Sequence, residues 1–415
     1  MTRAQVHTQP GCEHYGSQLA MPPELAARLR RFAFDYGDTY AAYLVTEGDR
    51  EYFWSSGRRG VVGFCRRGRY VTIADGLFAA PEDRAALLGE FLAFAQLNRW
   101  HTSYLNVPRS DVNLFRSQGC EVTKCGEEPR VRLQHVRWQG KTWEWVRRQE
   151  SYCKRHGVEM REVIPEAEGE GYAGRIVPQL EQISRDHISG TLHRRELRFF
   201  VSQFSAADLR QRRLFIAEQQ GAIIAFIVCN PGLQGNFWAV EVYRRRRDAT
   251  RGVIPALIMH AMRQMKSEDV DYFSLSLAPF LRCTPLVGDS VIFRTVANTW
   301  WRFLNPIYDV QGLFHFKSRF RPDYREMYLA AYPRITVRSL LAMAKTWQLF
   351  RFNPLRMAWR SLRRSPSGEG RGLATPDRAS DRLIRHLRAR PPARPASEPL
   401  ALAAVGAMPG GDEPG

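Results

Sequence analysis

The sequence has no apolar run long enough for a membrane-spanning helix. Such a helix needs about 18 or more apolar residues in succession, and the longest run here, residues 222–229, has the length of a buried strand. The first 21 residues are polar and do not contain the apolar core of a signal peptide. We therefore expect a cytoplasmic protein, with at most a peripheral contact on the inner face of the cytoplasmic membrane.

Cysteine is scarce and its spacing is uninformative. The seven cysteines are odd in number and form no Cys-x-x-Cys pair. Cys120 and Cys125 lie close together, but no second pair and no histidine spacing completes a zinc site. We expect reduced cysteines, no metal site and no resident cofactor. No Ser-His-Asp pattern is identifiable either.

Acidic residues are too few to balance the basic ones. The 61 Lys and Arg residues against 42 Asp and Glu give a net charge of +19. A high-GC genome would explain the preference for Arg over Lys, but not the net excess. The excess favours a polyanionic partner such as nucleic acid, anionic lipid headgroups or a phosphate-rich cofactor.

The apolar residues suffice for ordinary hydrophobic cores and follow strand and helix periods. They make up 44% of the 415 residues, a length that suggests two domains with extensions. Strands are predicted over residues 40–45, 51–54, 60–64, 70–74, 101–107, 214–217, 221–230, 235–243 and 270–277. Helices are predicted from residue 81 and over residues 143–157, 177–188, 196–202 and 252–266.

Changes in composition divide the chain. We predict a flexible leader over residues 1–27, an N-terminal domain over 28–161 and a C-terminal catalytic domain over 162–335. A basic amphipathic helix over 336–364 interleaves apolar and aromatic residues with Lys and Arg, and either lies on an anionic bilayer or packs across the second domain. Residues 365–415, rich in Ser, Gly, Pro and Arg, are predicted to be disordered.

The segment 235–279 is the most informative stretch. It reads as the last strand of an antiparallel meander, a basic turn, a helix and a further strand, which is the arrangement at the heart of the acetyltransferase-like (GNAT) fold. In that fold, the turn before the helix presents backbone N–H groups to a phosphate-bearing donor. Here the turn has one glycine, Gly252, where acetyl-CoA enzymes favour two. It carries guanidinium groups instead, which suit a larger polyanion, although a solvated basic loop has the same composition.

Residues 241–252 (EVYRRRRDATRG) resemble the Asp-Leu-Met-Arg-His-Arg-Pro-Asp-Ala-Pro-x-Gly stretch of the C-terminal domain family of phosphatidylglycerol lysyltransferase (multiple peptide resistance factor; DUF2156). Further matches follow in the same order as in the family. They are GEE at 126–128, QGK at 139–141, IS at 183–184 with a following glutamate, SLSLAP at 274–279 and GLFHFKSRFRP at 312–322. The resemblance spans roughly residues 32–332.

The resemblance implies an α+β fold of tandem GNAT-like domains, each a mostly antiparallel sheet flanked by helices. It implies transfer of an aminoacyl group from aminoacyl-tRNA, the donor substrate, to a hydroxyl of an anionic phospholipid or to a related hydroxyl or amine acceptor. Many members carry an N-terminal multi-span flippase, which this sequence does not contain.

The matched motifs imply the site residues. Glu241 stands where the family has Asp, as the orienting or proton-accepting carboxylate, and Arg244 stands at the family's Arg, as a charge stabiliser. A strand-end carboxylate paired with the neighbouring arginines is the other interpretation of Glu241. Lys317 and Arg319 match the paired cations of Phe-Lys-x-Lys-Phe and would hold the tRNA 3′ end or a lipid phosphate; the alternative is an exposed basic edge strand.

Three further candidates for substrate binding come from the basic turn and from the flanking motifs, and a fourth comes from a position at which this sequence differs from the family motif. They are Arg246, Arg251, Glu196 and Ser276. Ser276 replaces the glycine of the family's Ser-Leu-Gly and narrows the space at that strand end. Glu241 has a side chain one methylene longer than the family's Asp, and this difference alters the geometry of the reacting groups. The transfer fold survives these departures, but the acceptor and the amino acid do not carry over.

Two other functions remain open at this point. One keeps the fold but uses an acyl-CoA donor, and CoA binding without tRNA binding would distinguish it. The other is a non-catalytic module that docks on a membrane or on RNA through its basic faces. The oligomeric state is not predicted.

Overall fold

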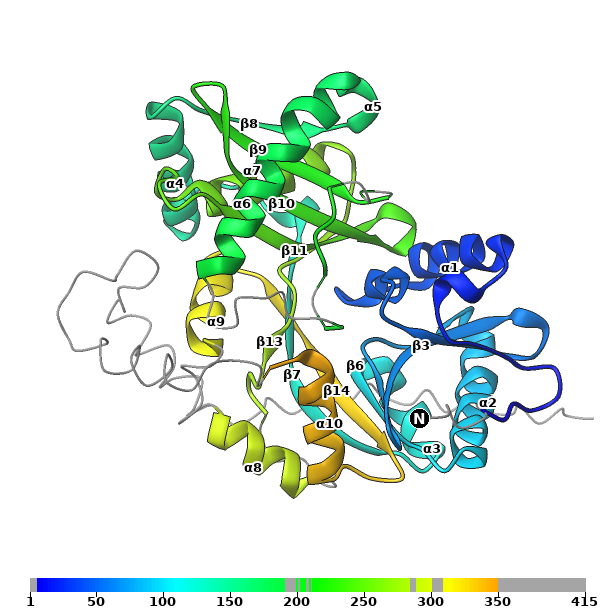
Figure 1. The fold of residues 1–415 in the computed structure, drawn as a ribbon. Helices are drawn as coiled ribbons and strands as arrows, with labels where there is room; N and C mark the ends of the chain where they lie inside the picture. The colour runs from blue at the N-terminus through cyan, green and yellow to red at the C-terminus, as the bar shows by residue number, and fades with distance from the viewer. Residues whose placement is uncertain are drawn as a thin grey trace, which may run out of the picture. The chain divides into compact units, whose positions relative to one another are not determined.

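A mixed β-sheet forms the central layer of the fold, and helices pack against both of its faces (Figure 1). The computed structural model describes residues 6–190, 199–200, 202–206, 209, 211–283, 289–300 and 309–349. These residues belong to one unit, Met1–Leu373. The predicted tail and the end of the predicted basic helix, from residue 350 on, lie outside the described residues.

The described strands share one sheet, in the order β1-β2-β3-β4-β6-β14-β7-β12-β11-β10-β9-β8, with β5 paired to β3 and β13 paired to β7. The strands are β1 (Glu13–Tyr15), β2 (Glu51–Trp54), β3 (Gly60–Arg67), β4 (Tyr70–Ile73), β5 (Phe78–Ala79), β6 (His101–Pro108), β7 (Glu121–Arg132), β8 (Val158–Val163), β9 (Arg213–Gln219), β10 (Ala222–Gly232), β11 (Phe237–Arg245), β12 (Tyr272–Ser274), β13 (Ala278–Pro279) and β14 (Asp323–Tyr332). The helices are α1 (Pro23–Tyr36), α2 (Arg84–Leu97), α3 (Val112–Ser117), α4 (Glu144–Arg155), α5 (Pro165–Glu168), α6 (Val177–Gly190), α7 (Val253–Ser267), α8 (Val291–Thr299), α9 (Val310–Ser318) and α10 (Val337–Trp347).

Two strand–helix–strand crossovers give the fold an internal repeat. Strands β4 and β6 are parallel and are joined through α2, while β11 and β12 are parallel and are joined through α7. Parallel neighbours need such a crossover, whereas antiparallel strands need only a turn. The other pairs are antiparallel, so the predicted α+β class with two similar, mostly antiparallel halves is confirmed.

Strands β7 and β14 join the two halves. Strand β14, the last in the described part of the chain, lies between β6 and β7, and β7 pairs on its other side with β12 and β13. The sheet therefore continues without a break from one half to the other through β14, β7 and β12, whereas the predicted division at residues 161 and 162 falls within β8, at one end of the sheet. Gly126 on β7 permits the close approach of β13, because a Cβ there would lie 2.7 Å from the Ala278 carbonyl oxygen.

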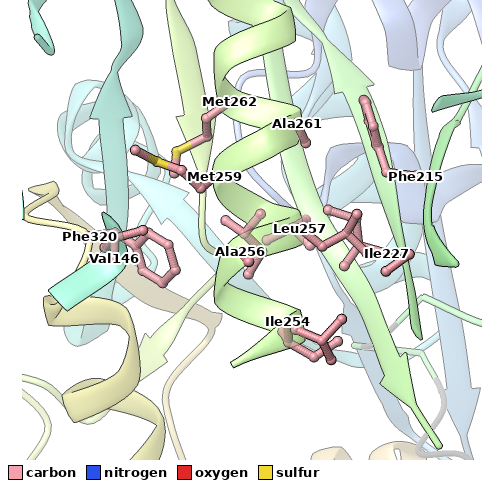
Figure 2. Packing of buried hydrophobic residues seen from close by; sticks show 14 of the residues in the cluster. Val146, Phe215, Ile227, Ile254, Ala256, Leu257, Met259, Ala261, Met262 and Phe320 are labelled. Carbon is pink, nitrogen blue, oxygen red and sulfur yellow. The ribbon is translucent and has the colours of Figure 1, made fainter. Parts of the chain in front are cut away.

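The largest core lies around α7, whose apolar residues are buried on nearly every side. Figure 2 shows Leu257 facing Ile227 of β10, while Val146 of α4 and Phe320 approach the same helix from the other side. Burying a leucine or isoleucine side chain contributes roughly 1.5–3 kcal/mol. The packing therefore fixes α4, α7 and the end of α9 relative to β11.

Most of the predicted elements are confirmed, including the strands at 51–54 and 60–64 and the helices that became α2, α4, α6 and α7. The strand predicted over residues 40–45 is wrong: Ala42–Thr46 forms a 3-10 helix. Its apolar run is buried, and a short buried run has no period that separates a strand from a helix. The strand predicted over 270–277 is shorter, because β12 ends at Ser274; an irregular connection over residues 275–277 then leads to β13. The helix predicted over 196–202 lies largely outside the described residues.

Within the described part of the chain, no helix combines the length and the apolar character needed to cross a bilayer. All seven cysteines are free.

Candidate active site

Glu241 occupies a β-bulge in the middle of β11. Val242 pairs with Val228 of β10 and Val240 pairs with Cys229, so Glu241 has no partner in this ladder. A bulge changes the direction of a side chain and is common beside active sites. The bulge thus directs the carboxylate of Glu241 toward the gap where β12 gives way to β13.

Ser276 lies in that gap and holds the carboxylate. Its hydroxyl is hydrogen-bonded to Glu241 Oε1 and lies 2.6 Å from the carbonyl oxygen of Val240. The backbone of Ser276 has a φ of 63°, a left-handed conformation that costs a non-glycine residue about 1–2 kcal/mol. This explains why glycine suits the position in the family motif. Glu241 and Ser276, the two residues that differ from the family motifs, are therefore in direct contact. The sequence did not reveal this relation.

Lys317 reaches the same place from the last turn of α9. Its side chain is 3% exposed, and its ammonium donates a hydrogen bond of 2.8 Å to the carbonyl oxygen of Leu277. The alternative of an exposed basic edge strand is wrong, because the motif forms a helix end whose lysine points inward. The carbonyl of Leu277 belongs to the same β12–β13 connection as Ser276.

The pKa values of Glu241 and Lys317 shift toward each other. Burial raises the pKa of the Glu241 carboxyl above its ordinary value of 4.5, against the effects of the Ser276 hydroxyl and the Lys317 charge. Burial also lowers the pKa of the Lys317 ammonium below its ordinary value of 10.5, against the charges of Glu241 and Glu128. A pair shifted in this way can take up and release a proton near neutral pH, which is the requirement for acid–base catalysis.

Glu128 of β7 is a buried carboxylate that sequence reasoning missed. It is fully buried and accepts hydrogen bonds from Ser274 Oγ (2.6 Å), the Tyr40 backbone N–H (3.1 Å) and Arg130 (2.8 Å). The negative charge of Glu128 acts on both Glu241 and Lys317. The Gly-Glu-Glu match at 126–128 was the available signal.

The segment 40–45, predicted as a strand, supplies part of this surrounding through Tyr40, which precedes the 3-10 helix. Besides its backbone bond to Glu128, Tyr40 donates its phenolic hydrogen to Asn106 Oδ1 at 3.1 Å. Asn106 in turn donates to the carbonyl oxygen of Ala74 at 2.8 Å. Burial and the nearby charge of Glu241 raise the pKa of Tyr40 well above 10. The N-terminal half thus contributes one wall of the site through β6, β7 and this segment.

Arg244 lies three residues from Glu241 but packs against another element. Its guanidinium is hydrogen-bonded to the hydroxyl of Ser184 on α6 and lies 5.4 Å from the ring centre of Phe204. The residue is 7% exposed. Ser184 comes from the matched Ile-Ser pair, so the structure joins two motifs there. The role of Arg244 as a charge stabiliser stays a prediction.

The remaining candidates are spread over the surface. Arg246 is exposed on the turn after β11 and pairs with Asp248 at 3.1 Å. Arg251 is exposed beside α4. The guanidinium of Arg319 lies over the ring of Trp145 at 5.5 Å, whereas Lys317 is buried, so the two cations of the motif lie in different surroundings. Glu196 lies outside the described residues.

The structure thus brings together Glu241, Ser276 and Lys317, with Glu128 and Tyr40 around them. This arrangement places a carboxyl group, an ammonium group and buried polar groups at the junction of the two halves. Among the described residues, no group of three or more His, Cys, Asp or Glu side chains is arranged to hold a metal ion.

Comparison with known proteins identifies the family. The family described as "Phosphatidylglycerol lysyltransferase, C-terminal" matches residues 30–331. Phosphatidylglycerol lysyltransferase of Bacillus subtilis is 24% identical over 304 residues, which cover 73% of this chain and 34% of that protein. The Staphylococcus haemolyticus protein of the same name is 21% identical over 317 residues, covering 76% and 37%. The chain therefore spans about a third of the length of the curated relatives it matches.

Solved structures share the fold. The structure of L-PGS from Bacillus licheniformis has a TM-score of 0.66 and 22% identity, covering 80% of this chain and 97% of that chain. A C-terminal DUF2156 domain from Agrobacterium fabrum also has a TM-score of 0.66, with 21% identity and coverage of 78% and 95%. The resemblance inferred from the motifs is confirmed, and the chain belongs to the family of the phosphatidylglycerol lysyltransferase C-terminal domain.

Proposed function

We propose that the protein is an aminoacyltransferase that moves an aminoacyl group from charged tRNA to a hydroxyl of a membrane phospholipid. Phosphatidylglycerol is the first acceptor to test and lysine the first amino acid, because the matched relatives are named for that reaction. The observation that carries the proposal is the partly buried Glu241 beside the buried Lys317, both at the connection between β12 and β13. Their shifted pKa values suit proton transfer in a chain that belongs to this family.

The proposed reaction exchanges one ester for another. Glu241 accepts the proton of the acceptor hydroxyl, whose oxygen attacks the carbonyl carbon of the aminoacyl ester. The tetrahedral intermediate collapses with cleavage of the bond to the tRNA ribose, and Lys317 gives a proton to the ribose oxygen that leaves. One C–O bond forms and one breaks, and the proton taken from the acceptor balances the proton given to the ribose. Transfer of the proton from Glu241 back to Lys317 restores the site.

Ser276 and Glu128 have supporting roles in this mechanism. The Ser276 hydroxyl lowers the pKa of Glu241 and so keeps part of the carboxyl ionised at neutral pH. The charge of Glu128 opposes the loss of the Lys317 proton. Ser276 thus favours the free carboxylate and Glu128 the protonated amine, the state that the first step requires, while the charge of Glu128 also raises the pKa of Glu241.

A membrane acceptor also requires contact with a bilayer, and α8 and α10 supply a suitable surface. These two helices pack together through Phe293, Ala297 and Met343 and lie side by side at the bottom of Figure 1. Five of the eight exposed large apolar residues of the described chain are on them, at 36–63% exposure: Val291, Ile292, Val296, Val337 and Leu341. We call these five residues the α8–α10 surface.

Basic residues accompany the α8–α10 surface. Arg294 follows the exposed pair on α8, and Arg338 and Lys345 share the exposed side of α10. Apolar side chains flanked by cations are the pattern of a surface that binds anionic membranes. This supports a peripheral placement on the inner face of the cytoplasmic membrane, where charged tRNA is present.

The proposed function is tested with purified protein, vesicles containing phosphatidylglycerol, and tRNA charged with labelled lysine. We expect label in the lipid fraction, and a rate at least 100-fold lower for Glu241→Gln, which removes the proton acceptor at nearly constant shape. Arg31→Ala, an exposed change on α1, is the matched control and should keep the wild-type rate.

Two results would contradict the proposal. If Glu241→Gln transfers label as fast as the wild type, the assigned base is wrong. If the wild type transfers nothing from any charged tRNA but acylates an acceptor from an acyl-CoA, the donor class is wrong. Binding of vesicles or RNA with no turnover of either donor would indicate a non-catalytic module.

A further inference from the structure

A pocket of about 490 Å³ lies between α4 and the turn that precedes α7, away from the Glu241 site. The mechanism above makes no use of it. Its lining comes from one side of α4 and from the residue just before the αL glycine that begins α7. The lining residues are Glu144, Arg147, Arg148, Gln149, Ser151, Tyr152, Arg155 and Arg251.

The pocket carries a net positive charge. Of its four arginines, only Arg148 is paired with a carboxylate, that of Glu144 at 2.5 Å. Arg147 donates to the carbonyl oxygen of Gly140 at 2.9 Å, and Arg155 Nε donates to its own helix at 3.3 Å. Hydrogen bonds to carbonyl groups do not neutralise a guanidinium. Arg251 has no side-chain partner among the described residues.

The pocket is built on a rigid base. Val146 and Cys153 of α4 are fully buried against α7, and Figure 2 shows Val146 facing that helix. The Cys153 thiol donates to the carbonyl oxygen of Arg251 at 3.7 Å. Gly252 has a φ of 80°, and a Cβ there would lie 3.2 Å from the Cβ of Gln149. The glycine thus permits the close approach that places Arg251 beside α4.

The arginines are spaced for a ligand with several anionic groups. Arg148 and Arg155 are seven residues apart on α4, which corresponds to about 10 Å along the helix axis. Guanidinium groups bind phosphate oxygens through paired N–H donors. A single phosphate would occupy one end of the pocket, whereas a phosphodiester chain would contact both ends.

The surroundings favour a nucleic acid over a lipid surface. None of the pocket's lining residues is a large exposed apolar residue, and a surface that binds bilayers usually inserts such side chains. The exposed apolar residues of α8 and α10 lie on other elements of the fold. The lining instead includes Tyr152, whose ring stacks on His156 at 4.0 Å.

A basic path leads from the pocket toward the candidate active site. Trp145, one turn before Gln149 on α4, lies under the guanidinium of Arg319 at 5.5 Å. Arg319 follows the end of α9, two residues after the buried Lys317. The ring of Trp145 also packs against Phe320 at 6.3 Å, which ties α4 to this segment. A strand whose phosphates occupy the pocket would therefore continue along α4 toward Lys317.

We propose that this arginine pocket binds the phosphate backbone of the acceptor arm of the donor tRNA. The inference rests on the proposed function, since it assumes that charged tRNA is the donor. It assigns a positioning role to Arg148, Arg155 and Arg251: they hold the arm while the aminoacyl ester lies at Glu241 and Lys317. Binding through these contacts is independent of the nucleotide sequence.

The test compares the wild type with the triple variant Arg148→Ala, Arg155→Ala and Arg251→Ala. The matched control removes three exposed arginines elsewhere: Arg31→Ala, Arg69→Ala and Arg185→Ala. Binding of uncharged tRNA and of a short acceptor-arm hairpin is measured at several salt concentrations. The KM for charged tRNA, kcat and vesicle binding are measured in parallel.

We expect the pocket variant to raise the KM for charged tRNA about 10- to 100-fold while kcat stays within about twofold. The slope of log binding constant against log salt should fall by about 2 to 3, because each phosphate contact contributes about 0.7–0.9. The hairpin should bind almost as tightly as whole tRNA, and vesicle binding should not change. The control variant should change both slope and KM by much less.

Three results would overturn the inference. If the wild type transfers label and the pocket variant keeps its KM and salt slope, the pocket is not the tRNA site, although the proposed function stands. If the pocket variant loses vesicle binding and keeps tRNA binding, the arginines belong to a lipid surface. If the wild type neither binds tRNA nor uses it as donor, the proposed function fails together with the inference.

Discussion

The hydroxyl of Ser276 can be removed in two ways that differ in their effect on the backbone. Ser276→Ala removes the hydrogen bond to Glu241 but keeps a Cβ at a φ of 63°. Ser276→Gly removes the hydrogen bond and also releases the left-handed strain. The two variants therefore separate the contribution of the hydroxyl to the chemistry from its contribution to stability.

The structure gives the expected magnitudes. A hydrogen bond to a charged group contributes about 1.5–3 kcal/mol, so both variants should lose about 5- to 50-fold in transfer rate at neutral pH, because a smaller fraction of Glu241 is then ionised. The bond lowers the pKa of Glu241, so its loss should raise that pKa by about 1–2 units. Since the base must be ionised, the acidic limb of the pH–rate profile should move to higher pH in both variants.

Stability should divide the two variants. Glycine at a left-handed position avoids a cost of about 1 kcal/mol or more, so Ser276→Gly should unfold at a higher urea concentration than Ser276→Ala. The assays are transfer of labelled lysine to phosphatidylglycerol vesicles between pH 5 and 9, and urea denaturation. Ser117→Ala on α3 is the control, since its hydroxyl bonds only a helix carbonyl. An unshifted pH profile in both variants would refute the role given to Ser276.

Three further perturbations address the lysine, a buried acid and the core. Lys317→Met and Lys317→Arg should both lower the transfer rate at least 100-fold, since neither side chain can give up a proton near neutral pH; full activity of the arginine variant would exclude a proton donor there. Burial raises the pKa of Asp75 from 3.8 to about 8, so the folded state holds this proton more tightly than the unfolded state. The free energy of unfolding is therefore highest at low pH and falls as the pH rises toward 8, by up to about 1.4 kcal/mol per pH unit. Asp75→Asn should therefore flatten the fall in melting temperature between pH 5 and 9, and an equally steep fall would contradict the assignment. Leu257→Ala should cost about 2–5 kcal/mol in urea denaturation with little change in rate per folded molecule, and a selective loss of activity would place α7 nearer the chemistry than its packing indicates.

Local patterns predicted the elements whose residues have a clear period. The strand at 51–54 follows from its run of aromatic residues after a turn, and the helix that became α2 from apolar residues three and four apart. The segment at 40–45 did not follow, because a short buried run has the same composition in a strand and in a 3-10 helix. Its place was decided by Tyr40, which contacts Glu128 and Asn106 across the sheet.

The candidate site was predictable as a set of residues but not as an arrangement. Motif matches gave Glu241, Ser276 and Lys317 individually. The bulge that directs Glu241, and the hydrogen bond that joins it to Ser276, depend on pairing with β10 and on the connection after β12. Such pairings join residues distant in the sequence, and no local pattern encodes them. Arg244 was grouped with Glu241 by proximity in sequence, whereas the strand turns it toward Ser184.

The position of β14 has a consequence for how the protein is made. Thr102 of β6 and Tyr332 of β14 are partners in the sheet, so the first half cannot close its sheet when its own residues leave the ribosome. At bacterial or eukaryotic rates of 5–20 residues per second, β6 and β7 wait on the order of 10–50 s for the strand that separates them. During that interval two long strand edges face the solvent, and such edges invite pairing with other chains. The link that places one continuous sheet around the candidate site therefore leaves the edges of β6 and β7 unpaired in the nascent chain until β14 is synthesised.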